Sequence, residues 1–281
     1  MFSKLRKVFQ SINWSSFYAE KMFNIQSDSY LQRNLFGNPE YKRKGKLNIF
    51  EFQSFSQNGE DGIINEIFNR IGTTNKYFVE FGVEDGMENN TLFLLNNSWS
   101  GTWIEAEPKN YTLIQNNFNS LISNGKLEVK NEFVSAENIE RILSDLRIPK
   151  EVDLLSIDID GNDYWVWSKI KNISPRIVVI EYNSHLGPSL KWVMKYKPDF
   201  RGKNTSYYGA SLKSLELLGS EKGYSLVGCN FTGCNSFFVR KDLIGDKFTG
   251  PFTSENFFEP PRFFLYRKNG HPRETGEFLN I

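Results

Sequence analysis

From about residue 50 onward, the 281-residue sequence alternates between short apolar runs and longer segments with helical periodicity. The apolar runs predict strands at residues 77–81, 101–106, 127–130 with 133–134, 152–158, 176–181, 224–229 and 236–240. The segments between them predict helices at 91–95, 108–121, 138–146, 164–170 and 210–222. Strands that alternate with helices form a mostly parallel sheet covered on both faces, and the last two strands are expected to pair antiparallel at its edge. We therefore expect an α/β fold that binds its ligand at the carboxyl ends of the strands.

An acidic turn follows the first predicted strand, with Gly82 and Gly86 at its ends and two acidic residues between them. Glycines let the backbone turn sharply and approach a ligand closely. The acidic residues would repel a pyrophosphate, which argues against NAD and favours a cationic ligand with an amino group, such as S-adenosylmethionine. Glu105, or its neighbour Glu107, ends the second strand, where an acidic side chain can accept both hydroxyls of a ribose. The pattern predicts a nucleoside site, with a solvent-facing glutamate as the alternative.

Carboxylates cluster where the fourth and fifth predicted strands end. Four aspartates lie within residues 153–163, and strand alternation points Asp158 and Asp160 to the same side. Such a pair repels unless a cation, a proton or a hydrogen-bond donor relieves it. Asp158, Glu181 and Asn183 offer oxygen ligands, which suit Mg²⁺ or Mn²⁺ better than zinc. We interpret these three as a candidate metal site, with a capped carboxylate network or direct recognition of substrate hydroxyls as alternatives.

His185 follows the fifth strand, and histidine is the natural general base near neutral pH. We predict catalytic roles for His185 and Asp160, with a structural or exposed histidine as the alternative. Residues 184–208 form a long basic connection where the substrate should enter. Its positive charge would suit a phosphorylated or nucleotide-linked sugar substrate. The alternative is that this segment is an ordinary solvated loop.

Positive charge is concentrated at the start of the chain. Residues 1–50 carry nine Lys or Arg and three Asp or Glu, so their net charge is +6, while that of the remainder is −5. Phe2, Leu5, Phe9 and Ile12 recur at helical spacing and predict a helical arm. The arm docks on an anionic membrane surface or a partner, or it packs on its own domain with a solvated basic face, which is the interpretation we favour.

Composition excludes several classes of protein. The overall net charge of +1 gives no bulk attraction to nucleic acid. No run approaches the roughly 20 apolar residues of a membrane-spanning helix, and no signal-peptide pattern follows the basic start. Two cysteines are too few for a disulfide framework. We expect a cytoplasmic globular protein.

Five motifs in a fixed order give the chain a family resemblance: SQNGEDG (56–62), YFVEFGVEDG (77–86), GTWIEAEP (101–108), LLSIDIDGNDYWVW (154–167) and IEYN (180–183). The chain resembles FkbM-like methyltransferases, which use S-adenosyl-L-methionine and often tailor sugars, polyketides or surface polysaccharides. The resemblance covers roughly residues 54–243. It implies a Rossmann-like, doubly wound, mostly parallel sheet of seven strands with a reversed last strand. We divide the chain into the arm (1–50), a methyltransferase domain (51–243) with residues 184–208 as a substrate-side insertion, and an aromatic tail or lid (244–281), which is also a candidate oligomer contact.

The resemblance also implies the cofactor site. Residues around the glycine turn would surround the methionine end and the ribose, Glu105 would bind the ribose hydroxyls, and residues 133–135 would lie near the adenine. The full set of expected cofactor-binding residues is Gln57, Glu80, Gly82, Gly86, Asn90, Thr91, Glu105, Phe133, Val134, Ser135 and Asp158, and Asp61 is expected in the same cleft. The spacing also resembles metal-dependent O-methyltransferases, although Tyr182 stands where an amide or acidic ligand is expected.

The sequence thus predicts a methyltransferase that O-methylates a sugar or a surface or capsular polysaccharide precursor, in a bacterium with an AT-rich genome. One alternative is O-methylation of a phosphate-like (phosphoramidate) group in capsule biosynthesis. Others are a nucleotide-sugar or NAD-binding protein without methyl transfer, and a non-catalytic partner that keeps the fold.

Overall fold

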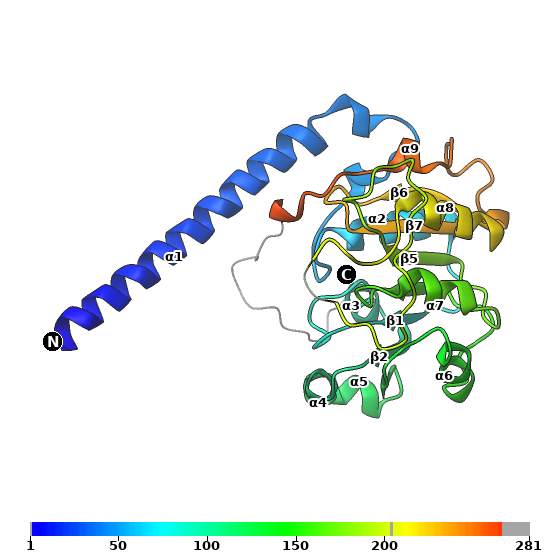
Figure 1. Cartoon of the computed structure of the whole chain (residues 1–281), viewed down its shortest axis with the longest axis horizontal. Coiled ribbons are helices and arrows are strands. Elements are labelled where there is room, and N and C mark those ends of the chain that lie inside the picture. The colour runs from blue at the N-terminus through cyan, green and yellow to red at the C-terminus, as the bar shows by residue number, and fades with distance from the viewer. Residues whose placement is uncertain (1, 203–204, 266–281) are drawn as a thin grey trace.

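A single seven-stranded sheet forms the centre of the computed structural model, which describes residues 2–202 and 205–265, with side chains from residue 14 onward. The strands are β1 (Tyr77–Phe81), β2 (Ser100–Glu105), β3 (Leu127–Asn131), β4 (Leu154–Ile157), β5 (Ile177–Glu181), β6 (Tyr224–Cys229) and β7 (Asn235–Arg240). Their order is β3-β2-β1-β4-β5-β7-β6, and only β7 runs antiparallel to its neighbours (Figure 1). The predicted α/β class and the reversed last strand are confirmed.

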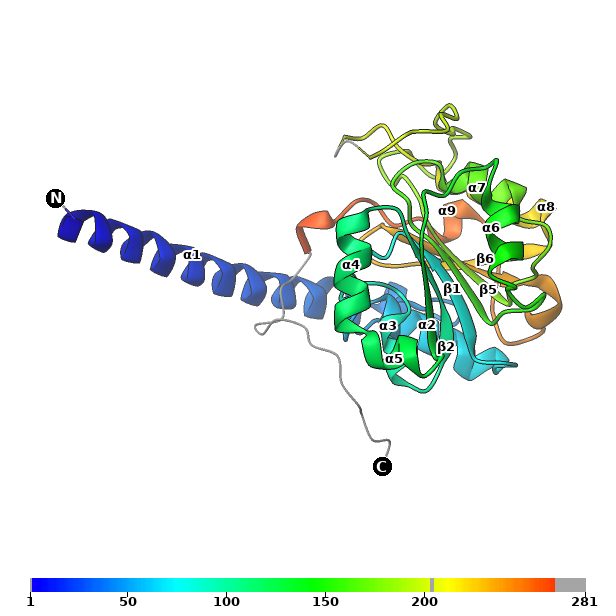
Figure 2. The same cartoon turned by 90° about the horizontal axis from the view of Figure 1, so that it is seen from below.

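Helices cover both faces of this sheet (Figure 2). One face carries α2 (Glu60–Ile71), α3 (Leu92–Asn96), α4 (Pro108–Asn117) and α5 (Asn119–Ser123), and the other carries α6 (Ile139–Asp145), α7 (Asp163–Lys169), α8 (Leu212–Glu221) and α9 (Ser254–Phe257). Strand alternation supplies both cores: Phe78 and Leu154 face the first group of helices, while Val79 and Leu155 face the second. Because both faces are buried, the strands are mostly apolar.

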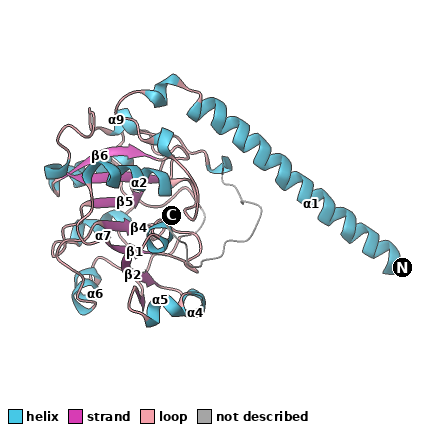
Figure 3. Ribbon diagram, turned by 180° about the vertical axis from the view of Figure 1, so that it is seen from behind, coloured by secondary structure: helices cyan, strands magenta, loops and turns pink. Residues whose placement is uncertain are grey.

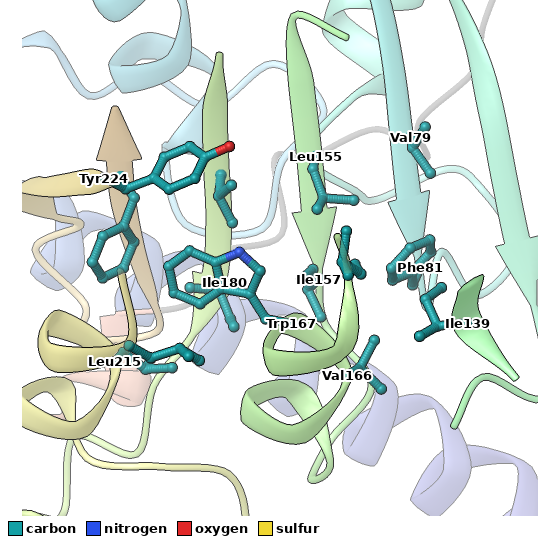
Figure 4. Close-up of a cluster of buried hydrophobic side chains, with 14 of the residues drawn as sticks. Val79, Phe81, Ile139, Leu155, Ile157, Val166, Trp167, Ile180, Leu215 and Tyr224 are labelled. Carbon is teal, nitrogen blue, oxygen red and sulfur yellow. The ribbon is translucent and has the colours of Figure 1, made fainter. Parts of the chain in front are cut away.

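The core under α6, α7 and α8 fixes the strand ends from which the site is built (Figure 4). Phe81, Ile157 and Ile180 occupy the carboxyl-terminal halves of β1, β4 and β5 and are fully buried. Val166 and Trp167 of α7 pack against this row. Large-to-small changes at such sites cost about 2–5 kcal/mol, so the three strand ends are held firmly together.

Two helical predictions need correction. The helix α2 has no counterpart among the predicted elements, although Ile63, Ile64, Ile67 and Ile71 recur at helical spacing and are buried. The helix expected over residues 108–121 is wrong as a single element. It breaks at Phe118, whose ring packs edge-on against Trp103 at 4.9 Å between centroids, so the chain turns inward between α4 and α5.

The helix α1 (Phe2–Leu31) projects away from the sheet and its covering helices (Figures 1 and 3). The side chains of Phe2, Leu5, Phe9 and Ile12, which prompted the prediction of an arm, lie outside the described residues. From residue 14 to residue 26 the described side chains are nearly all exposed. Residues 14–26 therefore do not pack on the domain, while the interpretation of the stripe at residues 2–12 stays a prediction.

The chain after α1 does pack on the domain. Leu35 and Tyr41 form a small core with Phe231 and Leu265, and the Tyr41 hydroxyl donates to the buried Glu259 carboxylate at 2.9 Å. The projecting part is thus the helix itself. None of the helices in the described part of the chain is long and apolar enough to cross a membrane.

Candidate functional site

A cleft of about 480 Å³ lies where the carboxyl ends of β1, β2, β4 and β5 meet. Most of the predicted site residues line it: Gln57, Glu80, Gly82, Asn90, Glu105, Phe133, Val134, Asp158, Asp160 and Glu181. The remaining predicted residues are not part of its lining: Gly86, Thr91, Ser135, Asn183 and His185. The local order of strand, turn and helix therefore brings most of the expected side chains to one place.

The turn after β1 requires glycine at its first position. Gly82 has a φ of +74°, and a methyl group there would lie 1.7 Å from the carbonyl oxygen of Asp158. The turns after β1 and β4 therefore meet backbone to backbone, which only glycine permits. Gly86, with φ of +82°, packs instead against the rings of Trp103 and Phe118 and shapes the turn from behind.

Glu105 ties two loops to the end of β2. One carboxylate oxygen accepts the backbone N–H of Glu84 at 2.9 Å, and the other accepts that of Glu107 at 2.8 Å. A carboxylate offers about four acceptor positions, and the side chain of Asn110 also bonds to Glu105, so part of this capacity is left for a ligand. Burial raises the pKa of Glu105, and these two amides oppose that shift by stabilising its charged form. The side chain is thus a fixed acceptor of the kind that binds a diol.

Glu80 is the centre of a buried network beside this turn. Its carboxylate accepts the hydroxyls of Thr91 and Ser156 and the backbone N–H of Asn90, and burial raises its pKa to about 7. Thr91 in turn accepts the indole N–H of Trp103 at 2.8 Å. Thr91 therefore positions Glu80 from outside the cleft, and the N–H of Asn90 is already used within the protein.

Phe133 and Val134 form the apolar part of the cleft after β3. The guanidinium of Arg201, from the 184–208 connection, lies 5.2 Å from the centroid of the Phe133 ring and pairs with the Glu107 carboxylate. Ser135 uses its N–H to bond the Asn138 side chain at 2.8 Å. Part of the predicted insertion therefore covers the cleft on the β2–β3 side.

Three carboxylates converge at the ends of β4 and β5. Asp158, Asp160 and Glu181 each bring an oxygen within 4.8 Å of the other two. Burial raises the pKa of Asp158 and of Glu181, and repulsion within the group raises both further. The second oxygen of Glu181 is buried and has no hydrogen-bond partner. This arrangement calls for a proton, a cation or a ligand donor between the side chains.

The other two aspartates of residues 153–163 have structural roles. Asp163 accepts the backbone N–H groups of Ile159 and Gly161, both at 2.8 Å, and so shapes the loop that carries Asp160. Asp153 lies at the opposite end of β4, where it accepts three backbone amides of residues 74–76 and pairs with Arg176.

Asn183 and His185 lie outside the carboxylate group. The Asn183 amide donates to the carbonyls of Ser206 and Tyr208, both at 2.9 Å, and its oxygen accepts the N–H of His185. His185 is exposed, with its ring edge-on to Phe263 at 5.8 Å between centroids. The third member of the oxygen cluster, beside Asp158 and Glu181, is Asp160, whereas the sequence predicts Asn183.

Sequence reasoning missed Glu60 and Asn235, which also line the cleft. One Glu60 oxygen accepts the side-chain N–H₂ groups of Asn230 and Asn235, both at 3.0 Å. Because a carboxylate only accepts, this contact fixes the Asn235 amide with its oxygen free, and that oxygen is buried without a partner. Asn235 is also the direct cross-strand neighbour of Glu181, so two unpaired acceptors lie side by side.

The motif at residues 56–62 is the available signal, and the sequence predicts Gln57 and Asp61 from it; Gln57 lines the cleft. In the structure Asp61 does not line the cleft: its carboxylate accepts the backbone N–H groups of residues 54–56 at 2.7–3.0 Å. The adjacent Glu60 faces the cleft instead. Glu60 and Asp61 are the first two residues of α2, and the position of the helix start decides which of the two side chains faces the cleft.

Charge in the cleft is strongly one-sided. Ten carboxyl groups contribute to its lining, namely Glu60, Glu80, Glu84, Glu88, Glu105, Glu107, Glu132, Asp158, Asp160 and Glu181, while Arg201 is the one basic residue among the described lining residues. Burial raises the pKa of Glu84, and the carboxylates of Asp160 and Asp85 raise it further. Such a field attracts cations and hydrogen-bond donors and repels phosphates.

Comparison with known proteins finds similarity in fold. No family model matches the sequence, so the FkbM-like resemblance stays a prediction, and no curated protein matches it either. Among solved structures, the N-terminal domain of EvdMO1 with SAH bound has a TM-score of 0.44 at 12% identity, covering 68% of this chain and 82% of that one. An O-methyltransferase from Bacillus cereus in complex with SAH has a TM-score of 0.44 at 14% identity, covering 75% and 88%. TrmK from M. capricolum with S-adenosyl-homocysteine has a TM-score of 0.38 at 11% identity, covering 63% and 65%. These values describe similarity of fold alone.

Proposed function

We propose that this protein is an S-adenosylmethionine-dependent methyltransferase. The observation that carries the proposal is Glu105, a carboxylate at the end of β2 whose two oxygens are fixed by the amides of Glu84 and Glu107 beside the Gly82 turn. A carboxylate in this position binds the two ribose hydroxyls of a nucleoside. Phe133 and Val134 supply the apolar surface that an adenine ring needs.

The charge of the cleft fits the other half of the cofactor. When bound, S-adenosylmethionine supplies an electrophilic methyl group on a positively charged sulfur, beside an ammonium group. Glu80, Glu84 and Asp158 line the cleft near the β1 turn and favour those two positive charges. The same carboxylates disfavour the pyrophosphate of NAD, which argues against the dinucleotide alternative.

For the acceptor we propose a hydroxyl group of a sugar or of a surface polysaccharide precursor. The support is the pair of buried, unpaired oxygens on Glu181 and Asn235, which need hydrogen-bond donors such as hydroxyls. The phosphate-like acceptor has less support. The lysines of the 184–208 connection that can be described, Lys191, Lys195 and Lys197, are exposed and absent from the cleft lining, and Arg201 already pairs with Glu107.

Asp160 is our proposed acceptor-side base. It lines the cleft and lies in the oxygen cluster with Asp158 and Glu181, whereas His185 does not line the cleft. A carboxylate there takes the proton of the attacking hydroxyl and orients it. The all-oxygen cluster also fits Mg²⁺ or Mn²⁺, which would be held by these three side chains and would make a hydroxyl more acidic.

Calorimetric titration with S-adenosylhomocysteine tests the proposal, first with Mg²⁺ and then after EDTA. We expect micromolar binding to the wild-type protein. The Glu105→Ala variant should bind about 10- to 100-fold more weakly, because it loses charged hydrogen bonds of ~1.5–3 kcal/mol.

Glu128→Ala is the matched control, since Glu128 is an exposed acid on the neighbouring strand β3. Its affinity should equal that of the wild type. No binding by the wild type, or unchanged binding by Glu105→Ala, would overturn the proposal.

A further inference from the structure

The helix α1 exposes an apolar stripe that nothing in the described chain covers. Trp14, Tyr18, Met22 and Ile25 follow one another at spacings of four, four and three residues and are 60%, 58%, 54% and 59% exposed. These spacings place them on one side of a helix. Phe17 lies beside them at 51% exposure. In water such a row of large side chains is unfavourable, so it marks a docking surface.

The aromatic rings of the stripe are already ordered. Trp14 and Tyr18 stack with centroids 5.8 Å apart, and Phe17 meets Tyr18 edge-on at 5.7 Å. The ammonium of Lys21 lies 5.3 Å from the centroid of the Phe17 ring. A cation beside clustered Trp and Tyr side chains is the combination found where a helix lies at the boundary between lipid and water.

The base of α1 is anchored, which leaves the rest of the helix free to act as an arm. Ser27 and Leu35 are buried where the helix meets the domain. The thirty residues of α1 span about 45 Å, and the views in Figures 1 and 2 show the helix extending away from the sheet. The stripe therefore lies on a part of the helix that the domain does not shield.

Charge selects the occupant. The helix α1 has four Lys or Arg and two Asp or Glu, a net charge of +2; residues 32–50 add +4, and the rest of the chain carries −5. An anionic surface therefore attracts residues 1–50 and repels the rest of the chain. A second copy of the helix fits less well. Residues 14–25 contain a single branched aliphatic side chain, Ile25, and lack the repeating Leu, Ile or Val seam of a coiled coil.

We propose that α1 binds an anionic phospholipid surface, with the stripe of Trp14, Phe17, Tyr18, Met22 and Ile25 inserted at the lipid–water boundary and the basic residues of the arm near the headgroups. The helix lies on the membrane and does not cross it, in agreement with the absence of a spanning helix in the described residues. Attachment is reversible, because one amphipathic segment gives modest affinity. The inference does not depend on the proposed methyltransferase activity.

Vesicle co-sedimentation of the full chain tests it. Vesicles of equal parts phosphatidylglycerol and phosphatidylcholine should bind the protein at low salt, with a clear loss in high salt. Vesicles of phosphatidylcholine alone should bind it far less. The variant Trp14→Ser/Tyr18→Ser/Met22→Ser should lose at least about tenfold in partitioning, because it removes the apolar area that would enter the lipid.

The control is Trp192→Ser, which removes an equally exposed tryptophan (62%) from the connection after β5. It should partition like the wild type, and all variants should keep the wild-type melting temperature. Absence of binding to the anionic vesicles, or equal binding by the triple variant, overturns the proposal. A dimer seen by light scattering that the triple variant abolishes, without vesicle binding, would overturn it in favour of a second copy.

Discussion

Replacing Gly82 by alanine would place a methyl group between the turns that follow β1 and β4. The methyl carbon would lie 1.7 Å from the Asp158 carbonyl oxygen, whereas ordinary contacts begin at 3.4 Å, so the two turns must separate by about 1.7 Å. That oxygen belongs to backbone and cannot swing aside as a flexible side chain would. The separation would carry Asp158 away from the carboxylates of Asp160 and Glu181.

Two terms set the expected loss of stability. Alanine at a φ of +74° costs about 1–2 kcal/mol, and forcing extra volume into a packed contact costs about 1–3 kcal/mol more. We therefore expect the free energy of unfolding of Gly82→Ala to fall by about 2–5 kcal/mol, measured by urea denaturation. Affinity for S-adenosylhomocysteine, measured by calorimetry, should fall as well, because the turn lines the cleft.

Gly125→Ala separates the two terms. Gly125 has nearly the same φ, +75°, but a methyl group there meets nothing within 4 Å, so only the backbone term of about 1–2 kcal/mol applies. The difference between the two variants measures the clash alone. If Gly82→Ala were no less stable than Gly125→Ala, the close approach of the two turns would be refuted.

Three further predictions concern a buried acid, a buried hydrogen bond and the oxygen cluster. Burial raises the pKa of Asp61 from 3.8 to about 6, so between these pH values the folded state holds a proton that the unfolded state has lost. The free energy of unfolding should therefore fall by about 3 kcal/mol as pH rises through this window. Urea denaturation below pH 3.8 and above pH 6 should show this loss in the wild type and a smaller one in Asp61→Asn. Tyr41→Phe removes the hydroxyl bonded to the buried Glu259 and should cost about 1–3 kcal/mol in the same assay, whereas Tyr207→Phe, at an exposed ring, should cost nothing measurable; equal effects would refute the role of the bond. Titration of EDTA-treated protein with Mn²⁺ should show binding that Glu181→Gln weakens at least tenfold. Absence of Mn²⁺ binding to the wild type would refute the metal site, and protons or ligand donors would then offset the repulsion among the three carboxylates.

The strands and the reversed last strand were the most predictable part of the molecule. Both faces of a parallel sheet are buried, so its strands are apolar runs such as residues 77–81 and 176–181. Such runs can be recognised in the local sequence. The polar residues that stop those runs then meet at one edge of the sheet. Glu105 and Glu181 could therefore be assigned to a common site from sequence alone.

Helix limits depended on contacts that the sequence does not display. The break falls at Phe118, whose ring packs against Trp103 of β2, and neither Gly nor Pro stands at that point. The course of α1 is a similar case. Its amphipathic pattern does not say whether the helix packs on its own domain, and only the structure shows that nearly all the described side chains before Ser27 are exposed.

The sequence by itself determined the α/β class, the strand-end location of the cleft and its acidic character, because each follows from local periodicity and from where polar residues interrupt it. Only the tertiary structure decided which polar side chains line the cleft and which bond within the protein. Antiparallel pairing of β5 with β7 brings Asn235 beside Glu181. The side-chain amide of Asn183 donates to the carbonyls of Ser206 and Tyr208 and is therefore not available to the cleft. Such partners are far apart in the chain, and no local pattern encodes the distance between them.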